Sequence, residues 1–312
     1  VCTVRKDAGD DPDITNGVRM TASVRRIEKG VTIEGGAGVG RITRPGLAMP
    51  VGEAAINPGP RQQIADAVHR AAQQNGYGGG FSVTISVKDG EALAAQTYNG
   101  HLGIVGGISI LGTSGIVEPM SEKALVDTIR LELDSLYAQG QRIAFLCPGN
   151  YGADFARETL ELDLERAVKC SNYIGEAFDF AVSSGFSKVI LVGHIGKLVK
   201  LAGGIMNTHS KEGDCRMELL AAAALKSGGS KTQALEILEA VTTEEGIRIL
   251  QEGGNLQKTM QILMEKIMFY LQKRAAGRLQ IECMMYANGY GLLAESSGAE
   301  AMLEALMKKN GN

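Results

Sequence analysis

Hydrophobic and polar positions follow one pattern before Gly140 and another after it. Before Gly140, short segments alternate between apolar and polar residues, which is typical of strands with one buried face. The glycines of Gly35–Gly38 lie between two such segments and predict a hairpin. Helices are expected at Arg61–Gln74 and at Glu122–Gln139, which Gly140 ends. The strands expected in this part are Val1–Arg5, Val18–Ile27, Val31–Glu34, Val39–Thr43 and Phe81–Val87.

After Gly140, continuous apolar runs alternate with helical segments. A run such as Val189–Val192 is typical of a parallel strand that is covered on both faces. Strands that alternate with helices predict right-handed crossovers, and Asn288 with Gly289 predicts a tight turn. The expected strands are Arg142–Cys147, Val189–Val192, Leu279–Tyr286 and Leu292–Glu295, and the expected helices are Ser171–Ser184, Asp214–Lys226, Lys231–Val241, Glu244–Gln251, Leu256–Arg274 and Ala299–Lys308.

These patterns predict two domains of different class. Residues 1–139 are expected to form an α+β domain with antiparallel strands. Residues 140–312 are expected to form an α/β Rossmann-like domain with a mainly parallel sheet. In such sheets, ligands bind outside the carboxyl ends of the strands, so the candidate site is expected there.

Composition argues against a protein that binds nucleic acid or membrane surfaces, and it favours a cytoplasmic location. The 312 residues carry 32 basic and 35 acidic side chains, a net charge of −3, which argues against a nucleic-acid or membrane-surface binder. A polyanionic small ligand stays compatible with this charge, because its site needs only a local basic cluster. The five cysteines include no C-x-x-C pair and are expected to be reduced thiols. With no signal peptide or membrane-spanning run expected, we predict a cytoplasmic protein whose oligomeric state stays open.

The stretch from Lys188 to Ser210 concentrates polar and ionisable side chains. Two of the chain's four histidines and two lysines follow directly on the apolar run Val189–Val192. The histidines are candidates for a general base, an anion donor or a metal ligand, but no zinc spacing is present and we expect no metal. A solvated loop would also explain the histidines, and a solvated helix face explains the lysines equally well. The candidates are Gly193, His194, Gly196, Lys197, Lys200, Asn207, Thr208 and His209.

A glycine-bearing loop follows the apolar run Arg142–Cys147. If this strand lies beside Val189–Val192, the two loops form one crevice, in which a nucleoside-containing cofactor is the usual occupant. An ordinary turn at Pro148 explains the loop equally well. The cofactor candidates are Gly149, Asn150, Gly152, Gly193 and Gly196.

Other nucleotide-binding motifs are incomplete. Gly107–Ser114 resembles a P-loop, but Thr113 stands where the phosphate-binding lysine is needed, which argues against an ATPase. The glycines of Gly35–Gly38 precede a strand rather than a helix, which argues against a dinucleotide fingerprint. Basic residues do border the loops of the first domain, where arginine suits carboxylate recognition. These residues are Arg5, Lys6, Arg41, Arg44 and Arg61.

Taken together, these stretches resemble one family, the cobalt-precorrin-5B C1-methyltransferases of anaerobic cobalamin biosynthesis. The resemblance extends over almost the whole chain, and several blocks are long enough to be highly specific. The blocks that carry it are Val4–Asp13, Gly38–Gly40, Pro45–Leu47, Val51–Pro58, Gly103–Val117, Pro119–Ser121, Pro148–Asn150, His194–Gly204 and Asn207–Ser210.

The resemblance implies transfer of a methyl group from S-adenosyl-L-methionine to C1 of cobalt-precorrin-5B, a polycarboxylate tetrapyrrole, giving cobalt-precorrin-6A. The methyl donor is expected in the crevice beside Gly149 and Gly193. His194 and His209 are the catalytic candidates, and we expect them to position the macrocycle rather than act as a general base. The expected substrate-binding residues are Arg61, Ser114, Lys197, Lys200, Asn207 and Thr208.

The sequence differs from this family at its start. Family members usually begin with a small-residue segment that leads into an alanine-rich helix, whereas this sequence opens at Val1. We expect that segment to be missing here, so the residue set above is incomplete if the segment contributes to the site. The alternative function is a non-catalytic tetrapyrrole-binding or scaffold protein of the same pathway, which would show the loops without affinity for S-adenosyl-L-methionine.

Overall fold

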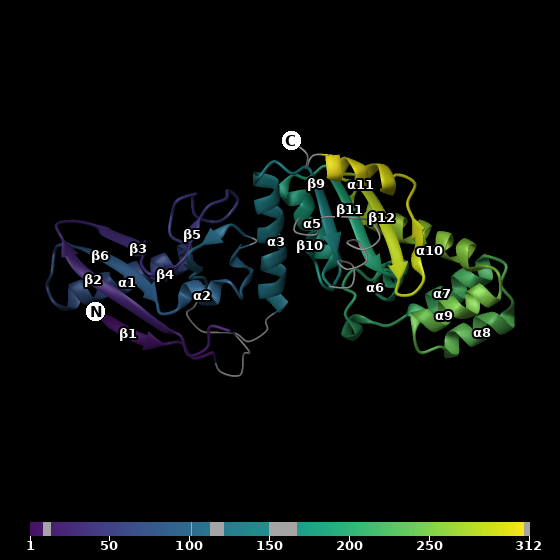
Figure 1. Cartoon of the computed structure of the whole chain (residues 1–312), viewed down its shortest axis with the longest axis horizontal. Coiled ribbons are helices and arrows are strands. Elements are labelled where there is room, and N and C mark those ends of the chain that lie inside the picture. Colours follow the sequence, from purple (N-terminus) through teal and green to yellow (C-terminus); the bar gives the residue numbers. More distant parts are fainter. Residues whose placement is uncertain (9–13, 101, 113–121, 150–166, 309–312) are drawn as a thin grey trace. The chain divides into compact units, whose positions relative to one another are not determined.

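The computed structural model of the chain describes residues 1–312 except 9–13, 101, 113–121, 150–166 and 309–312 (Figure 1). The chain forms two compact units, Val1–Leu125 and Val126–Asn312. The division falls in the first turn of α3 (Glu122–Ala138), whereas the boundary predicted from the sequence lies after this helix. Most of α3 belongs with the second unit because Ile129 and Leu133 are buried in that unit's core.

The first unit is built on a sheet of four strands. Its elements are β1 (Cys2–Arg5), β2 (Arg19–Ile27), β3 (Val31–Gly35), β4 (Gly38–Val39), β5 (Arg41–Ile42), α1 (Pro58–Gln74), β6 (Gly80–Val87), α2 (Gly90–Ala94), η1 (Tyr98–Gly100), β7 (Ile104–Val105) and β8 (Gly107–Ile108). The sheet has the order β1-β2-β6-β3 (Figure 1), antiparallel except that β3 runs parallel to β6. Alternate residues of β2 and β6 pack with α1 in one core, which is the half-buried pattern that the sequence predicts.

The prediction of a hairpin at Gly35–Gly38 is wrong. β3 pairs with β6, while β4 pairs with β8 and β5 pairs with β7. The glycines allow close approach to β6 instead of forming a two-strand turn. A Cβ atom on Gly38 would lie 2.0 Å from the carbonyl oxygen of Val87, and one on Gly36 would lie 2.3 Å from Oγ of Ser86. The segment therefore needs glycine because a neighbouring strand occupies the space of a side chain.

The second unit contains a sheet of five strands with the order β10-β9-β11-β12-β13 (Figure 1). These strands are β9 (Ile143–Cys147), β10 (Ala167–Lys169), β11 (Lys188–His194), β12 (Gln280–Ala287) and β13 (Gly291–Glu295). The first four in the spatial order are parallel to their neighbours, whereas β13 is antiparallel to β12. β10 was not predicted from the sequence, because its three residues are too few to show a period.

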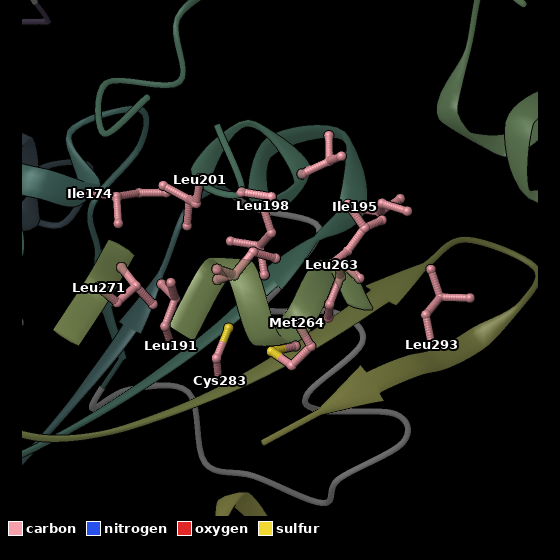
Figure 2. Close-up of a cluster of buried hydrophobic side chains, with 14 of the residues drawn as sticks. Ile174, Leu191, Ile195, Leu198, Leu201, Leu263, Met264, Leu271, Cys283 and Leu293 are labelled. Atoms are coloured by element: carbon pink, nitrogen blue, oxygen red, sulfur yellow. The ribbon is translucent and has the colours of Figure 1, made fainter. Parts of the chain in front are cut away.

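Helices cover both faces of this second sheet. They are α5 (Ile174–Ser184), α6 (Ile195–Leu201), α7 (Arg216–Lys226), α8 (Lys231–Glu239), α9 (Thr243–Glu252), α10 (Leu256–Ala275) and α11 (Ala299–Lys308), with η3 (Ser210–Glu212) between α6 and α7. In the larger core, Leu198 of α6 and Leu263 of α10 lie with Leu191 and Cys283 of the sheet (Figure 2).

The opposite face of the same sheet packs against the C-terminal helix. Met302 and Leu303 of α11 share a smaller core with Phe145 of β9 and Ile190 of β11. Since both faces are buried, residues of either parity along β9 and β11 are apolar, as the continuous runs predict. Within the described ranges, no helix combines the length and the apolarity needed to cross a bilayer.

Candidate active site

The carboxyl ends of β9, β10 and β11 meet at one edge of the second sheet. β9 pairs in parallel with β10 on one side and with β11 on the other, so the strand order reverses at this place. β9 and β11 are therefore neighbours, as a shared site requires. A reversal of this kind is where ligands bind in open α/β sheets. The segments that leave this edge begin with Pro148, Cys170 and Ile195.

His194 ends β11 and caps the first turn of α6. Its Nδ1 accepts a hydrogen bond from the backbone N–H of Gly196 at 3.1 Å, which satisfies one of the free donors at the helix start. The ring also meets Tyr286 of β12 edge to face, with centroids 5.5 Å apart. On the other side of the ring, Nε2 lies 3.1 Å from Oε1 of Glu244 in α9. His194 therefore links β11, α6, α9 and β12.

The contacts of His194 determine where its proton lies. Because Nδ1 accepts a hydrogen bond, the neutral ring carries its proton on Nε2, beside the Glu244 carboxylate. That carboxylate lies off the direction of the ring N–H, so Nε2 is buried without an aligned acceptor among the described residues. Burial lowers the pKa of His194, and Glu244 opposes this effect. In this tautomer the neutral ring has no free lone pair, because Nδ1 accepts from Gly196. The catalytic role of His194 stays a prediction.

His209 also caps a helix, in an exposed loop. Its Nδ1 accepts a hydrogen bond from the N–H of Lys211 at 3.1 Å and caps η3. Its own backbone N–H donates to Oδ1 of Asn207 at 3.1 Å. In the part of the chain that the structure describes, no three His, Cys, Asp or Glu side chains gather as a metal site. A catalytic role of His209 stays a prediction, since the structure explains its ring as a loop cap.

Lys197 lies where the three strands end. Its Nζ donates to the carbonyl oxygen of Ser171 at 3.2 Å, and a Cβ atom on Gly149 would lie 3.6 Å from the same Nζ. Burial lowers the pKa of Lys197 and the charge of Lys200 lowers it further, whereas a Cys170 thiolate would raise it. Burial also raises the pKa of the Cys170 thiol to about 12, so this thiol is neutral and gives Lys197 no anionic partner. Two of the three ammonium N–H groups have no hydrogen-bond acceptor among the described residues, and they could donate to an anion.

Lys200 differs from Lys197 although they are one helical turn apart. Its side chain is buried, with 4% of its surface exposed, and its Nζ donates to the carbonyl oxygens of Thr208 at 3.2 Å and Gly213 at 2.9 Å. Thr208 is in turn held by Asn172, through a backbone bond of 2.9 Å and a side-chain bond of 3.3 Å. Lys200 and Thr208 therefore tie the loop after α6 to the loop after β10. Their roles in substrate binding, like that of Asn207, stay predictions.

The glycines of the predicted crevice have different surroundings. A Cβ atom on Gly193 would lie 2.8 Å from Cγ of Pro148 and 3.0 Å from Leu198, so internal packing alone requires glycine there. A Cβ atom on Gly196 would lie 3.2 Å from Nδ1 of His194. Gly149 has φ +115°, which favours glycine, and among the described residues its Cβ position meets only the Lys197 side chain within 4 Å. Of these three glycines, Gly149 is the one whose Cβ position is not closely packed by described residues.

The predicted site residues of the first unit and of the loop after β9 have mixed outcomes. Arg61 uses all three guanidinium nitrogens inside the protein, with Nε donating to Ile56 O at 2.9 Å and Nη1 to Ile33 O at 2.9 Å. Its Nη2 lies 3.4 Å from a carboxylate oxygen of Glu53. The structure thus explains Arg61 as a tie between loops, and its substrate role stays a prediction. The remaining candidates, which lie outside the described residues, are Ser114, Asn150 and Gly152.

Sequence reasoning missed residues that reach this edge from other elements. Ser171 and Asn172 follow the short strand β10, and Ser171 adopts φ +50°, which is uncommon for a residue with a side chain. Glu244 comes from the start of α9, fifty positions after His194. The capping residue Thr242 marks that helix start in the sequence, because its side chain accepts from Glu245 N–H. No local pattern indicates that this helix start lies beside β11.

Two family models match the chain. The model described as CbiD matches residues 1–119, and the model described as CbiD, C-terminal domain, matches residues 207–297. A solved structure, the cobalamin biosynthesis protein (cbiD) from Archaeoglobus fulgidus, is 29% identical over 73% of this chain and 67% of that chain. Its TM-score of 0.31 is too low to support an argument about the fold.

Curated relatives match the chain nearly end to end. The cobalt-precorrin-5B C(1)-methyltransferase of Ruminiclostridium cellulolyticum is 49% identical over 99% of this chain and 82% of the relative. Proteins of the same name from Alkaliphilus metalliredigens and Thermoanaerobacter sp. are 44% and 42% identical, over 98% and 95% of this chain and 80% of each relative. Together with the two family models, this similarity confirms the resemblance: the chain belongs to the CbiD family.

Proposed function

We propose that this chain is an S-adenosyl-L-methionine-dependent C-methyltransferase that methylates C1 of cobalt-precorrin-5B and yields cobalt-precorrin-6A in anaerobic cobalamin biosynthesis. The observation that carries the reaction is the match to relatives of that name, at up to 49% identity over nearly the whole chain. The strand order of the second unit supports a location, the edge where β9, β10 and β11 end. In this proposal the second unit is Rossmann-like, with β13 as an added antiparallel strand.

The residues at this edge suit the methyl donor in shape and charge. When bound, S-adenosyl-L-methionine supplies a methyl group that its sulfonium charge already activates, so the chain's task is mainly alignment. Gly149 suits close approach of a ligand to the backbone, because Lys197 is the one described side chain within 4 Å of its Cβ position. Lys197 offers two N–H donors and a positive charge, which suit the carboxylate of the methionine part.

His194 has a positioning role in this proposal. Its Nδ1 accepts from the first turn of α6 and its ring packs against Tyr286, so the neutral ring holds α6 in fixed relation to the strand end, with the Glu244 carboxylate of α9 3.1 Å from Nε2. The conjugated macrocycle supplies the electrons for attack on the methyl group, which removes the need for a strong base beside C1. The residues of α6 therefore act by orienting the reactants rather than by moving a proton.

Calorimetric titration with S-adenosylhomocysteine tests the proposal on the full chain. The wild type is expected to bind, and Lys197→Met, which removes the charge but keeps the length, should weaken binding by about 10-fold, the value of one charge-assisted hydrogen bond. Lys226→Met on α7 removes an exposed lysine of the same unit and should leave the affinity unchanged. Thermal unfolding of each variant establishes that it is folded.

Two results would contradict the proposal at different points. A wild-type chain that binds a tetrapyrrole but not S-adenosylhomocysteine would favour the scaffold alternative over the methyltransferase. A Lys197→Met variant with wild-type affinity would leave the methyltransferase standing but would move the donor site away from the edge formed by β9, β10 and β11.

A further inference from the structure

The four-stranded sheet of the first unit has a second face that α1 does not cover. The core residues of β2 and β6, such as Ala22 and Val83, all point to the α1 side. The register of the strands places a set of hydroxyl side chains on the other side, which we call the open face. These residues are Thr3, Thr21, Ser23, Thr32, Ser82, Thr84 and Ser86.

Three exposed cations lie side by side at one end of the open face. Arg5 of β1 is directly opposite Arg19 of β2. Lys88 follows β6, and its N–H donates to the carbonyl oxygen of Arg19 at 3.0 Å, so it extends the same cross-strand row. The Arg5 guanidinium lies over Gly17, whose Cβ position is 3.0 Å from Nη2. We call Arg5, Arg19 and Lys88 the cation row; adjacent strands are about 4.8 Å apart, so it spans about 10 Å.

The three side chains of the cation row have no ion-pair partner among the described residues. Like charges directly opposite each other destabilise a sheet, so an ordinary solvated face favours opposite charges at such positions. None of the three cations forms an ion pair with a described carboxylate. Glu34, the acid on the same face, already pairs with Arg41 at 3.3 Å. A row that keeps its mutual repulsion in the free protein is suited to a ligand with several negative charges.

We propose that the open face binds a polycarboxylate tetrapyrrole, with the cation row holding carboxylates along one side of the macrocycle. Arginine presents paired N–H groups to a carboxylate, and the hydroxyl row Thr3, Thr21 and Ser86 lies about 7 Å further along the strands, where it can donate to other substituents. That the ligand is a tetrapyrrole rests on the proposed function. That it carries several carboxylates is inferred from the three cations that the register of the sheet aligns.

The test is a titration of the full chain with uroporphyrin, a tetrapyrrole with carboxylates around its whole periphery, followed by porphyrin fluorescence. Arg19→Gln is expected to weaken binding by about 10-fold and the combined Arg5→Gln, Arg19→Gln and Lys88→Gln variant by about 100-fold. Rising salt concentration should weaken binding to the wild type. Arg70→Gln, which removes an exposed cation from α1, is the matched control and should bind as the wild type does.

The stability of the combined variant shows whether lost binding comes from unfolding. Because its substitutions remove like-charge repulsion, its melting temperature should equal or exceed that of the wild type. Failure of the wild type to bind uroporphyrin, or equal affinity of the wild type and the combined variant, would overturn the inference.

A parallel titration with S-adenosylhomocysteine keeps this inference separate from the proposed function. If S-adenosylhomocysteine binds but the cation-row substitutions leave uroporphyrin affinity unchanged, the inference alone is rejected. If those substitutions weaken uroporphyrin binding but S-adenosylhomocysteine does not bind, the inference is supported and the methyltransferase is rejected.

Discussion

Substitution of His194 distinguishes a positioning residue from a general base. His194→Ala removes the cap on the Gly196 N–H and the edge-to-face contact with Tyr286. A lost cap costs about 1 kcal/mol and a lost aromatic pair also costs about 1 kcal/mol, so the second unit should lose about 2 kcal/mol. His194→Asn keeps an oxygen that can accept from Gly196 and should lose about half as much. In a unit of this size each kcal/mol lowers Tm by about 2–4 °C, so the alanine variant should melt about 4–8 °C below the wild type.

Single-turnover methyl transfer at saturating substrate is the kinetic half of this experiment. Positioning predicts that His194→Asn keeps most of the rate of the chemical step and that His194→Ala loses more. A general base predicts that both variants fall by about 10²–10⁴-fold, since neither side chain can take up the proton. Ser230→Ala removes a comparable cap from α8, at a residue outside the candidate site, and serves as the control. Equal stability of the two His194 variants would refute the capping argument, and an equal collapse of their rates would refute positioning.

Two further predictions concern stability. Lys200→Met removes the donors to Thr208 O and Gly213 O, which should cost about 2–4 kcal/mol and speed amide hydrogen exchange over residues 208–213; unchanged exchange there would contradict it. Acid should destabilise the second unit through His194: burial lowers its pKa in the folded chain, so the unfolded chain binds the proton first as pH falls through about 6.5. Between about pH 7.5 and about pH 5.5, the melting temperature should therefore fall less for His194→Asn than for the wild type. Equal falls for the two proteins would contradict the prediction.

The sequence predicted best those elements whose pattern is long or whose ends are marked. The helix expected at Ala299–Lys308 has the same bounds in the structure, and the strand expected at Leu279–Tyr286 is shifted by one residue at each end. Strand pairing was harder to predict, because a glycine-rich segment marks a turn and a close approach of backbones equally well. Gly36 and Gly38 are explained by close approach of backbones rather than by a turn, but this is evident only from the position of β6 beside them.

The candidate site was predicted as a set of residues but not as a set of contacts. Lys197 and Lys200 share a helix and a residue type, yet among the described residues Lys197 donates to one carbonyl group and Lys200 to two. The difference comes from Gly213, which lies in a loop whose path the local pattern does not determine. Arg61 shows the same limit, since its partner Ile33 lies 28 positions earlier in the chain.

The two lysines of α6 also indicate which side chain the edge leaves for a ligand. Placing an ammonium partly out of water disfavours its charged form, which is why burial lowers the pKa of Lys197. Lys200 offsets burial with two carbonyl bonds, whereas Lys197 has one such bond and a neutral thiol, Cys170, beside it. A carboxylate at this edge would restore the missing partner and favour the charged form. The charged form of Lys197 is therefore less stable in the ligand-free chain than it would be beside a bound carboxylate. A positive charge placed in this way next to Gly149 supports anion binding more strongly than either histidine does, since both histidine rings are engaged as caps.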